Sequence, residues 1–398
     1  MAKVVHLTSV HPAFDVRIFH KECRALAAAG HEVTLIAPHE ADEQRDGIQV
    51  RAVAKPGNRF TRGTTTVWAV FRAAVRERGD IYHFHDPELM PIGLALKLLG
   101  KTVVYDVHES SRDTLLSKHW LLPFARKTAS KAIAALEWIV GRSCDAVITA
   151  TPRIAEMFPT NKTFPVRNYP DLDAFAKHRI EGKTAEKKND VAYAGAVSLE
   201  RGAREMVKAI ALIPEELGAR LVIAGPVPAG LEKELKSLPG WSRTVLLGRV
   251  PHEKVIGVLQ QCRMGLCVLH ATPNHLEALP IKMFEYMAAG IPVIASGFPT
   301  WRDIVGPAQC GLLVDPMSQQ EIASAITQLL RNPDAAVRMG SNGQQAAFEK
   351  YSWEAEASVL VRIYAALEKK SGAVGRPVAG QQQEQSKEKQ PAEEVAAR

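Results

Sequence analysis

Short apolar runs rich in β-branched residues alternate with amphipathic stretches along most of this 398-residue chain. Apolar runs of this kind are typical of strands buried on both faces of a parallel sheet, and the amphipathic stretches between them are typical of covering helices. The strands expected in the first half are 3–8, 33–37, 48–52, 81–85, 102–106 and 146–150. The pattern therefore predicts an α/β fold made of consecutive βα units.

The stretch between the first two predicted strands carries apolar residues at helical spacing. Val16, Phe19, Cys23 and Leu26 fall on one face of a helix, and Gly30 follows as the expected C-terminal cap. The chain is therefore expected to open with a βαβ unit.

The regular pattern stops near residue 168, and a charged run over 177–189 precedes a second βα series. The strands expected there are 191–193, 220–224, 244–247, 265–268, 292–295 and 312–314, with helices over 204–213, 255–262, 281–289 and 320–330. We predict two doubly wound, Rossmann-like domains, 1–170 and 190–352, joined by a linker at 171–189 and facing a central cleft. Functional residues are expected at that cleft, where the parallel strands end.

The C-terminal part of the chain divides into two stretches. A last helix is expected over 353–370, returning to the first domain and coupling the two halves. Residues 371–398 contain no aromatic residue and are rich in Gln, Glu and Lys, which predicts a disordered tail.

Composition restricts the class of protein. No apolar run reaches the roughly 18 residues that a membrane-spanning helix requires, and the first residues turn polar too early for a signal peptide, so a cytoplasmic protein is expected. The five cysteines are scattered and form no Cys-x2-Cys pair. Neither a disulfide framework nor a structural zinc site is therefore expected from them.

The net charge of +7 lies almost wholly in residues 1–170, which hold 23 Lys and Arg against 17 Asp and Glu. Such an excess favours anionic partners such as phosphates, acidic glycans or an anionic membrane surface. No nucleic-acid recognition motif accompanies the basic residues, so nucleic acid is not an expected partner.

Two acids eight positions apart are the sharpest local feature. Pro280 suits the first turn of a helix, which would leave Glu277 in the preceding loop and place Glu285 inside the helix. Both acids can hydrogen-bond hydroxyl groups of one sugar nucleotide while the helix N-terminus attracts phosphate. On spacing alone, two ordinary surface acids are an equally good interpretation.

The whole segment Glu277-Ala-Leu-Pro-Ile-Lys-Met-Phe-Glu285-Tyr-Met-Ala-Ala-Gly290 resembles the Glu-x7-Glu region of retaining glycosyltransferases with the GT-B fold, the group 1 family that includes bacterial polysaccharide enzymes. Further parts of the resemblance are residues 11–21, 26–33, 82–87, 104–109, 193–195 and 201–202. It covers nearly the whole chain before the tail. It implies a GT-B fold and transfer of a sugar from a nucleoside diphosphate sugar to a glycan or lipid-linked acceptor, in surface polysaccharide synthesis.

By this resemblance Glu285 would hold the ribose hydroxyls of the nucleotide, and Glu277 would face the donor sugar as a catalytic residue. A carboxylate suits the ribose because it can accept two hydrogen bonds at once. The sequence departs from the family pattern after the first acid, where Ala278 and Leu279 replace a glycine-rich stretch.

A second set of donor-binding candidates follows the first strand of the second series. Gly195 and Arg201 flank a loop in which small residues let backbone amides approach a diphosphate. Related enzymes often have an arginine where this chain has Ala196, so Arg201 is expected to bind the diphosphate with help from Lys282. With these fixed cations, no metal and no cofactor is expected beyond the donor as co-substrate.

The remaining candidates lie in the first domain. His108 ends a predicted strand where related enzymes put a histidine near the donor sugar, so it is expected to be catalytic. Asp15, Arg17, His85 and Glu109 are candidates for contact with the acceptor or the cleft. For each of them a purely structural role is the alternative.

A long helical stretch over about 115–141 combines the basic residues of 118–131 with Trp120, Leu121, Leu122 and Phe124. It could dock on an anionic membrane surface from the cytoplasmic side, as would suit a lipid-linked acceptor. A solvated helix pair packed on the sheet explains the same residues equally well.

Two other functions fit the same sequence. A sugar-nucleotide 2-epimerase of similar fold would bind the same donor but convert it without an acceptor. A non-catalytic GT-B scaffold protein is favoured by Ala196 in the phosphate loop, and it would bind nucleotide weakly or not at all.

Overall fold

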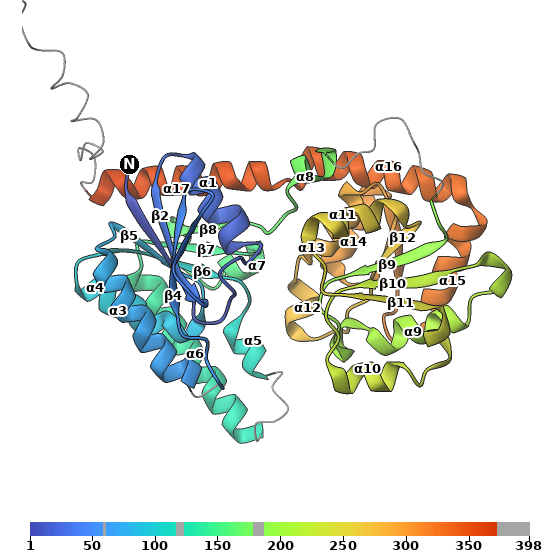
Figure 1. The fold of residues 1–398 in the computed structure, drawn as a ribbon, viewed down its shortest axis with the longest axis horizontal. Coiled ribbons are helices and arrows are strands. Elements are labelled where there is room, and N and C mark those ends of the chain that lie inside the picture. The colour runs from blue at the N-terminus through green and yellow to red at the C-terminus, as the bar shows by residue number, and fades with distance from the viewer. Residues whose placement is uncertain (59–60, 117–122, 178–186, 372–398) are drawn as a thin grey trace, which may run out of the picture.

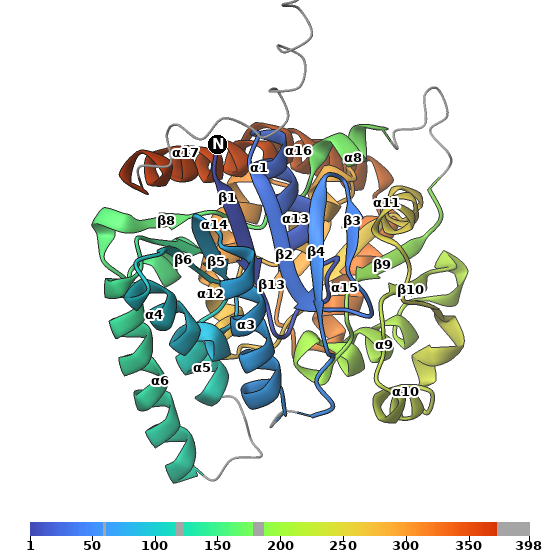
Figure 2. The ribbon, with the colours of Figure 1, turned by 60° about the vertical axis from the view of Figure 1, so that its left-hand side comes forward.

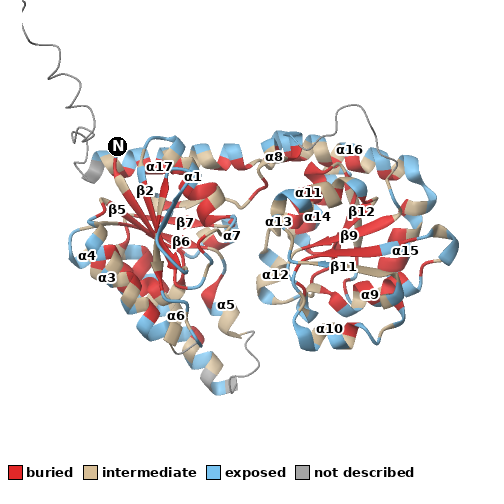
Figure 3. Ribbon diagram, viewed as in Figure 1, coloured by how far each residue is buried: buried red, intermediate tan, exposed pale blue. Residues whose placement is uncertain are grey.

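The computed structural model describes residues 1–58, 61–116, 123–177 and 187–371. Two α/β domains lie side by side, each with a parallel sheet between layers of helices (Figures 1 and 2). The two sheets are buried on both faces, as Figure 3 shows, and each face carries its own apolar core. The predicted fold class is confirmed.

The first sheet has the strand order β3-β4-β2-β1-β5-β6-β7-β8, and every pairing is parallel except that of β3 with β4. Its strands are β1 (Lys3–Leu7), β2 (Glu32–Pro38), β3 (Glu43–Arg45), β4 (Ile48–Val53), β5 (Ile81–Phe84), β6 (Thr102–Val107), β7 (Ala146–Thr149) and β8 (Thr163–Pro165). All six predicted strands are present. The short strands β3 and β8 were not predicted because neither forms an apolar run.

The helices of this domain cover the two faces of the first sheet. They are η1 (Ile18–Cys23), α1 (Arg24–Ala28), η2 (Arg62–Thr66), α3 (Val67–Glu77), η3 (Pro87–Leu89), α4 (Met90–Leu98), α5 (Ser111–Leu116), α6 (Pro123–Ser143), α7 (Pro152–Ala155) and η4 (Thr160–Lys162). The helix expected over 115–141 is wrong as a single element. Helices α5 and α6 pack against each other, and residues 117–122 between them lie outside the described part of the chain.

The second sheet has the order β11-β10-β9-β12-β13-β14 and is parallel throughout. Its strands are β9 (Asp190–Ala194), β10 (Arg220–Ala224), β11 (Thr244–Gly248), β12 (Met264–Cys267), β13 (Val293–Ser296) and β14 (Gly311–Val314). Its helices are η5 (Leu199–Arg201), α9 (Ala203–Ala211), η6 (Glu215–Leu217), α10 (Ala229–Leu235), η7 (Pro239–Arg243), α11 (His252–Gln261), α12 (Pro273–Glu277), α13 (Ile281–Ala288), α14 (Pro299–Ala308), α15 (Gln319–Arg331) and α16 (Pro333–Lys350). All the predicted strands are present, and the four predicted helices correspond to α9, α11, α13 and α15.

Two segments connect the domains. Helix α8 (Leu172–Lys177) lies in the predicted linker, part of which falls outside the described residues. Helix α17 (Trp353–Ser371) continues from α16 along one edge of both domains, and its apolar side packs into the core of the first domain through Leu360, Ile363, Tyr364 and Leu367 (Figure 1). The predicted tail, apart from Ser371, lies outside the described residues.

The helix after β1 has an unusual first part. Residues Ile18–Cys23 form a π-helical segment that runs directly into α1, and Ile18, Phe19, Glu22 and Cys23 are buried. The expected cap at Gly30 is present, since Gly30 has φ of +90° and its N–H donates to the carbonyl of Ala27. A π-helical segment frequently marks a functional site.

Candidate functional site

A cleft of about 1280 Å³ lies between the two domains and takes side chains from both. Seven of the ten predicted site residues line it, namely Asp15, Arg17, His108, Glu109, Arg201, Glu277 and Lys282. The other three, Gly195, His85 and Glu285, are not among its lining residues. Most of the residues predicted from the sequence therefore line one cleft, and three of them do not.

Glu277 differs from the expectation in its local structure. It is the last residue of the short helix α12 rather than part of a loop, because Thr272 caps that helix through the amide of His275 and Pro273 occupies its first turn. The indole Nε1 of Trp301 donates to the carbonyl of Ala278 at 2.8 Å and fixes the link to α13. Glu277 is thereby held exposed at the cleft.

Helix α12 also joins the two domains directly. The side-chain amide of Asn274 donates to the hydroxyl of Thr114 on α5 at 2.8 Å. Both residues line the cleft, so this bond fixes its width at one point.

Lys282 is a buried cation on α13. Its Nζ has no hydrogen-bond partner among the described residues and lies 3.6 Å from the ring centroid of Tyr193. Burial, and to a smaller extent the charge of Arg201, lowers the pKa of Lys282 to about 7. An ammonium group in this position is ready to bind an anion, because an anion would remove its desolvation cost.

Gly195 and Gly202 shape the backbone next to this cation. Gly195 has φ of +113°, and a Cβ there would lie 3.5 Å from Nζ of Lys282. A Cβ on Gly202, at φ of +73°, would lie 2.2 Å from the carbonyl oxygen of Val268. Both positions require glycine, and the loop between them, including the cleft residue Arg201, can approach a ligand closely.

Arg201 lies at the end of this loop. Its guanidinium donates to the carbonyl of Ala196 at 3.2 Å, and its side chain is partly exposed to the cleft. Arg201 and Lys282 therefore bring two cations to the same side of the cavity.

Glu285 is 5 % exposed and pairs with a residue that the sequence did not suggest. Nε2 of His252, at the start of α11, lies 2.8 Å from its Oε1. The hydrogen bond to Glu285 raises the pKa of His252. No local pattern could have found this pair, since the two residues are 33 positions apart and lie on separate helices.

His108 is held by a buried carboxylate. Its Nε2 lies 2.8 Å from Oδ2 of Asp106, whose side chain also accepts two hydrogen bonds from the Arg17 guanidinium at 2.9 and 3.1 Å. Arg17 holds the pKa of Asp106 well below its usual range against the effect of burial. The charged carboxylate selects the tautomer of His108 that is protonated at Nε2, which leaves Nδ1 as an acceptor.

Two first-domain candidates have different surroundings from those expected. His85 does not reach the cleft, because it is buried beside Asp106, with its Nδ1 3.1 Å from Oδ2. Arg17 borders the cleft but is only 4 % exposed, and its guanidinium is fully engaged by Asp106, Glu22 and the carbonyl of Val166. These two residues support the site from the buried side, and neither is free to bind a ligand in the cleft.

Asp15 and Glu109 also border the cleft. Asp15 accepts hydrogen bonds from the amides of Arg17 and Ile18 and lies 3.4 Å from His11. These partners lower the pKa of Asp15 although burial opposes them. Glu109 is exposed at the cleft, directly after His108.

Groups of side chains able to hold a metal ion occur, within the described ranges, only in the first domain. One consists of His85, Asp106 and His108, but Arg17 already neutralises its carboxylate. The other consists of His6, Glu22, His83 and His85. Neither lies beside Arg201 and Lys282 at the other side of the cleft.

The proposed membrane-docking stretch is only partly described. Trp120, Leu121 and Leu122 lie outside the described residues, whereas Phe124 at the start of α6 is 82 % exposed. No helix in the described part of the chain is both long and apolar enough to cross a membrane. Within the described part of 115–141, Phe124 and Trp138, the latter 55 % exposed, are thus both exposed aromatic side chains.

Family models match both halves of the chain. Residues 174–346 match "Glycosyl transferases group 1", and residues 16–166 match "Glycosyltransferase Family 4". Together the two matches cover both domains around the cleft.

Curated and solved proteins resemble the chain over most of its length. A glycogen synthase of Mycobacterium tuberculosis is 26 % identical over 399 aligned positions, covering 89 % of this chain and 91 % of the relative. The structure of sucrose-phosphate synthase from Thermosynechococcus elongatus superposes with a TM-score of 0.73 at 20 % identity, covering 92 % and 99 % of the two chains. HepE of Anabaena, solved with UDP-glucose, gives 0.68 at 15 % identity over 92 % and 100 %.

Proposed function

Because the chain is a GT-B glycosyltransferase of the group 1 family, we propose that it moves a sugar from a nucleoside diphosphate sugar to a glycan or lipid-linked acceptor, with retention of the anomeric configuration. The observation that carries the proposal is the unpaired ammonium of Lys282, buried beside Gly195 at the cleft. Synthesis of a surface polysaccharide is the proposed setting.

The donor diphosphate would bind between Lys282 and the loop from Gly195 to Arg201. Two cations and a loop bounded by Gly195 and Gly202, which carry no Cβ, suit a group that carries negative charge on closely spaced oxygens. The same cations would stabilise the charge that develops on the leaving diphosphate, so the proposed reaction needs no metal at this position. The proposal requires no cofactor besides the donor.

The acids at the two ends of the motif would have separate tasks. Glu285 would accept hydrogen bonds from the ribose hydroxyls, with His252 orienting its carboxylate. Glu277, exposed in the cleft, would face the donor sugar. The buried position of Glu285 means that the ribose must approach beside α11.

His108 would contact the sugar from the first domain. Its Nε2–H is directed to Asp106, so Nδ1 can accept a hydrogen bond from a sugar hydroxyl in the cleft. Front-face attack by the acceptor within an ion pair gives retention without an enzymatic nucleophile, and accordingly we assign none. Asp15 and Glu109 remain candidates for contact with the acceptor.

Donor specificity is proposed only at the level of the nucleoside diphosphate sugar. The solved HepE complex contains UDP-glucose, which supports a nucleotide sugar as the ligand class of such a cleft. Its 15 % identity to this chain carries no argument for uridine or glucose here.

A thermal-shift panel with UDP-, GDP-, ADP-, CMP- and dTDP-sugars tests donor binding, with Glu285→Ala and the exposed control Lys254→Ala measured in parallel. A ligand that binds only the folded protein raises its apparent stability. We expect a shift with one nucleotide that persists in Lys254→Ala and disappears in Glu285→Ala. No shift with any donor would favour the scaffold function, for which Ala196 in the phosphate loop is the specific evidence.

Turnover needs a separate experiment. Incubation with the donor identified above, first alone and then with candidate acceptors, should give a glycosylated product only when an acceptor is present. Determining the anomer of that product tests retention, because an inverted product would require a general base that the proposal does not contain.

Peripheral membrane contact is a further part of the proposal. The exposed Phe124 and the neighbouring exposed Lys127 suit the interface of an anionic bilayer. Sedimentation with phosphatidylglycerol vesicles should be reduced in Phe124→Ser. Equal sedimentation of both proteins, or none with the native protein, would contradict this contact.

A further inference from the structure

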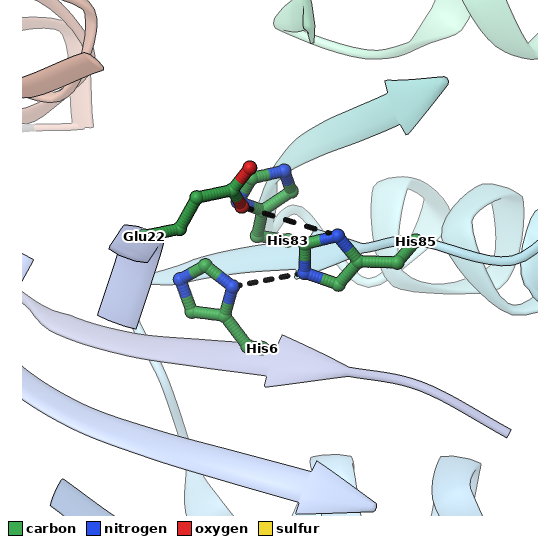
Figure 4. A group of neighbouring side chains, drawn as sticks. All are labelled: His6, Glu22, His83 and His85. Carbon is green, nitrogen blue, oxygen red and sulfur yellow. Dashed lines mark hydrogen bonds and ion pairs between the residues drawn. The ribbon is translucent and has the colours of Figure 1, made fainter. Parts of the chain in front are cut away.

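Four titratable side chains converge inside the first domain, away from the donor side of the cleft (Figure 4). His83 and His85 are two positions apart at the end of β5, so their side chains lie on one face of the sheet. His6 on the adjacent strand β1 is the register partner of His83. Glu22 is presented to the same face by the π-helical segment η1.

All four side chains are completely buried, and two of the histidines leave a ring nitrogen unsatisfied. The side chains of Glu22, His83 and His85 have no exposed surface, and His6 is 0 % exposed. Among the described residues, Nε2 of His6 and Nε2 of His83 lack a hydrogen-bond partner, whereas Oε1 of Glu22 lies 2.9 Å from Nε of Arg17. Unsatisfied buried groups are costly, so an unexplained set of them within one cluster points to a missing ligand.

The spacing of these groups is close to that of a metal site. Nδ1 of His6 lies 3.0 Å from Nε2 of His85, and one potential ligand atom from each of the four residues lies within 4.8 Å of the others. For a tetrahedral ion with metal–nitrogen bonds of about 2.0–2.1 Å, ligand atoms are about 3.3 Å apart. Glu22 Oε2 lies 4.0 Å from Nδ1 of both His83 and His85, so its side chain would have to turn for the carboxylate to reach an ion bound at the Nε2 atoms.

The imidazole rings have the spacing that a shared ion requires. The three ring centroids lie 4.5, 4.6 and 5.2 Å apart. Rings that share a tetrahedral ion have centroids about 5 Å apart, given the same bond lengths. Side-chain adjustment, without displacement of the strands, therefore suffices to complete the coordination.

Two of the histidines already have the outer partners that metal ligands have. Nδ1 of His85 lies 3.1 Å from Asp106, and Nδ1 of His83 lies 2.9 Å from the hydroxyl of Tyr364 on α17. A ligating histidine almost always directs its other ring nitrogen to a carboxylate, carbonyl or similar group, which fixes its tautomer and orientation. These bonds leave Nε2 of both rings available to the ion.

The charges around the cluster are compatible with a bound cation. The positive charge of Arg17, 2.9 Å from Glu22, is matched by the carboxylate of Asp106.

We propose that His6, Glu22, His83 and His85 bind one divalent d-block cation of the zinc class as a structural site. Three imidazoles and one carboxylate favour such an ion over magnesium or calcium, which prefer oxygen ligands. The site is closed on all sides by protein, as in structural zinc sites. It ties β1 and β5 to η1 and, through Tyr364, to α17, and it plays no part in the sugar transfer.

The first experiment measures metal in the native protein. The chain is produced without a polyhistidine tag, and its metal content is determined by plasma mass spectrometry. We expect about one equivalent of zinc or another d-block metal per chain. Protein treated with chelator should take up cobalt with the visible absorption of a four-coordinate nitrogen and oxygen site.

Absence of d-block metal in the purified protein, together with no cobalt spectrum on titration of the folded protein, would overturn the proposal. The cluster would then be a metal-free set of three buried histidines beside the Glu22 carboxyl group, which is paired with Arg17. This outcome is independent of donor binding, so failure of the metal site and failure of the proposed function can be told apart.

Variants locate the ion. Glu22→Gln and His83→Gln should abolish the stoichiometric cobalt signal, whereas the partly exposed control His39→Gln should retain it. Tyr364→Phe removes only an outer partner and should weaken metal affinity about 10- to 100-fold. Unchanged affinity in Tyr364→Phe and His83→Gln, with circular dichroism showing both folded, would place any bound ion elsewhere and refute the assignment.

Discussion

Arg17 and Lys282 are both buried cations that border the same cleft, but they differ in what surrounds the charge. The guanidinium of Arg17 is bound by two carboxyl groups and a carbonyl, whereas Nζ of Lys282 has no hydrogen-bond partner among the described residues. A fully paired buried charge orders the groups around it. An unpaired buried charge lowers the stability of the free protein. A ligand that supplies the counter-charge removes this cost, and the free energy recovered contributes to the affinity for the ligand.

The largest effect expected from this comparison is on stability. Arg17→Met leaves the buried carboxylate of Asp106 without its cation and should lower the free energy of unfolding by about 3–5 kcal/mol. Urea denaturation followed by circular dichroism measures it. The half-exposed Arg24→Met is the control and should change stability by less than about 0.5 kcal/mol. A loss below about 1 kcal/mol in Arg17→Met would show that Arg17 does not order the site.

Lys282→Met should have the opposite effect, with little or no loss of stability but a loss of affinity for the nucleotide sugar. Without ligand it removes an unpaired buried charge, so stability should stay the same or rise. Affinity for the nucleotide sugar should fall about 10- to 150-fold, the equivalent of one charged hydrogen bond of about 1.5–3 kcal/mol. Calorimetric titration compares it with the exposed control Lys254→Met. Unchanged affinity would remove Lys282 from the donor site.

The pH dependence of Lys282 sharpens the comparison. Because its folded pKa of about 7 lies below the ordinary 10.5, the folded protein binds fewer protons than the unfolded chain between these pH values. The contribution of Lys282 to stability therefore increases as the pH rises from about 7 to 10.5, and its full cost applies below pH 7. The difference in unfolding free energy between the native protein and Lys282→Met should show this slope. A flat difference would contradict a lowered pKa.

The smallest effect is expected at His252, a partly exposed cation paired with Glu285. Its pKa is raised by the hydrogen bond to Glu285, so the pair stabilises the fold below pH 6.5 and loses this contribution as the pH rises through the folded pKa. His252→Gln should lose less than about 1 kcal/mol at pH 6 and nothing at pH 9. Equal losses at both pH values would show that charge is not the cause.

The sheets could be predicted from the sequence because every central strand is an apolar run. The pairing of side chains could not, since Arg17 and Asp106 are 89 positions apart and become neighbours only through the strand order. Helix α12 is an intermediate case. Thr272 and Pro273 are a helix start signal that predicts α12, and hence the true setting of Glu277, but the signal is only two residues long.

The candidate site was predictable where residues follow strands or begin helices. His108, Arg201 and Lys282 were found at the cleft for this reason. His85 also follows its strand, yet its side chain lies on the buried face of the sheet beside His6 and His83. Residues two positions apart share a face of the sheet, so His85 lies on the same face as His83. That face is covered by η1 and α17. The ends of the strands therefore predict where the cleft lies. Which side chains are exposed in the cleft depends on the helices that cover the sheet.

Helix α17 has a consequence for the order of events during synthesis. It supplies Leu360, Ile363, Tyr364 and Leu367 to the core of the first domain, although the whole second domain precedes it in the chain. A ribosome therefore releases the second domain before the first domain can close its core. Until α17 has been synthesised, the first domain cannot complete its core, and the apolar face that α17 covers stays exposed to water and to chaperones.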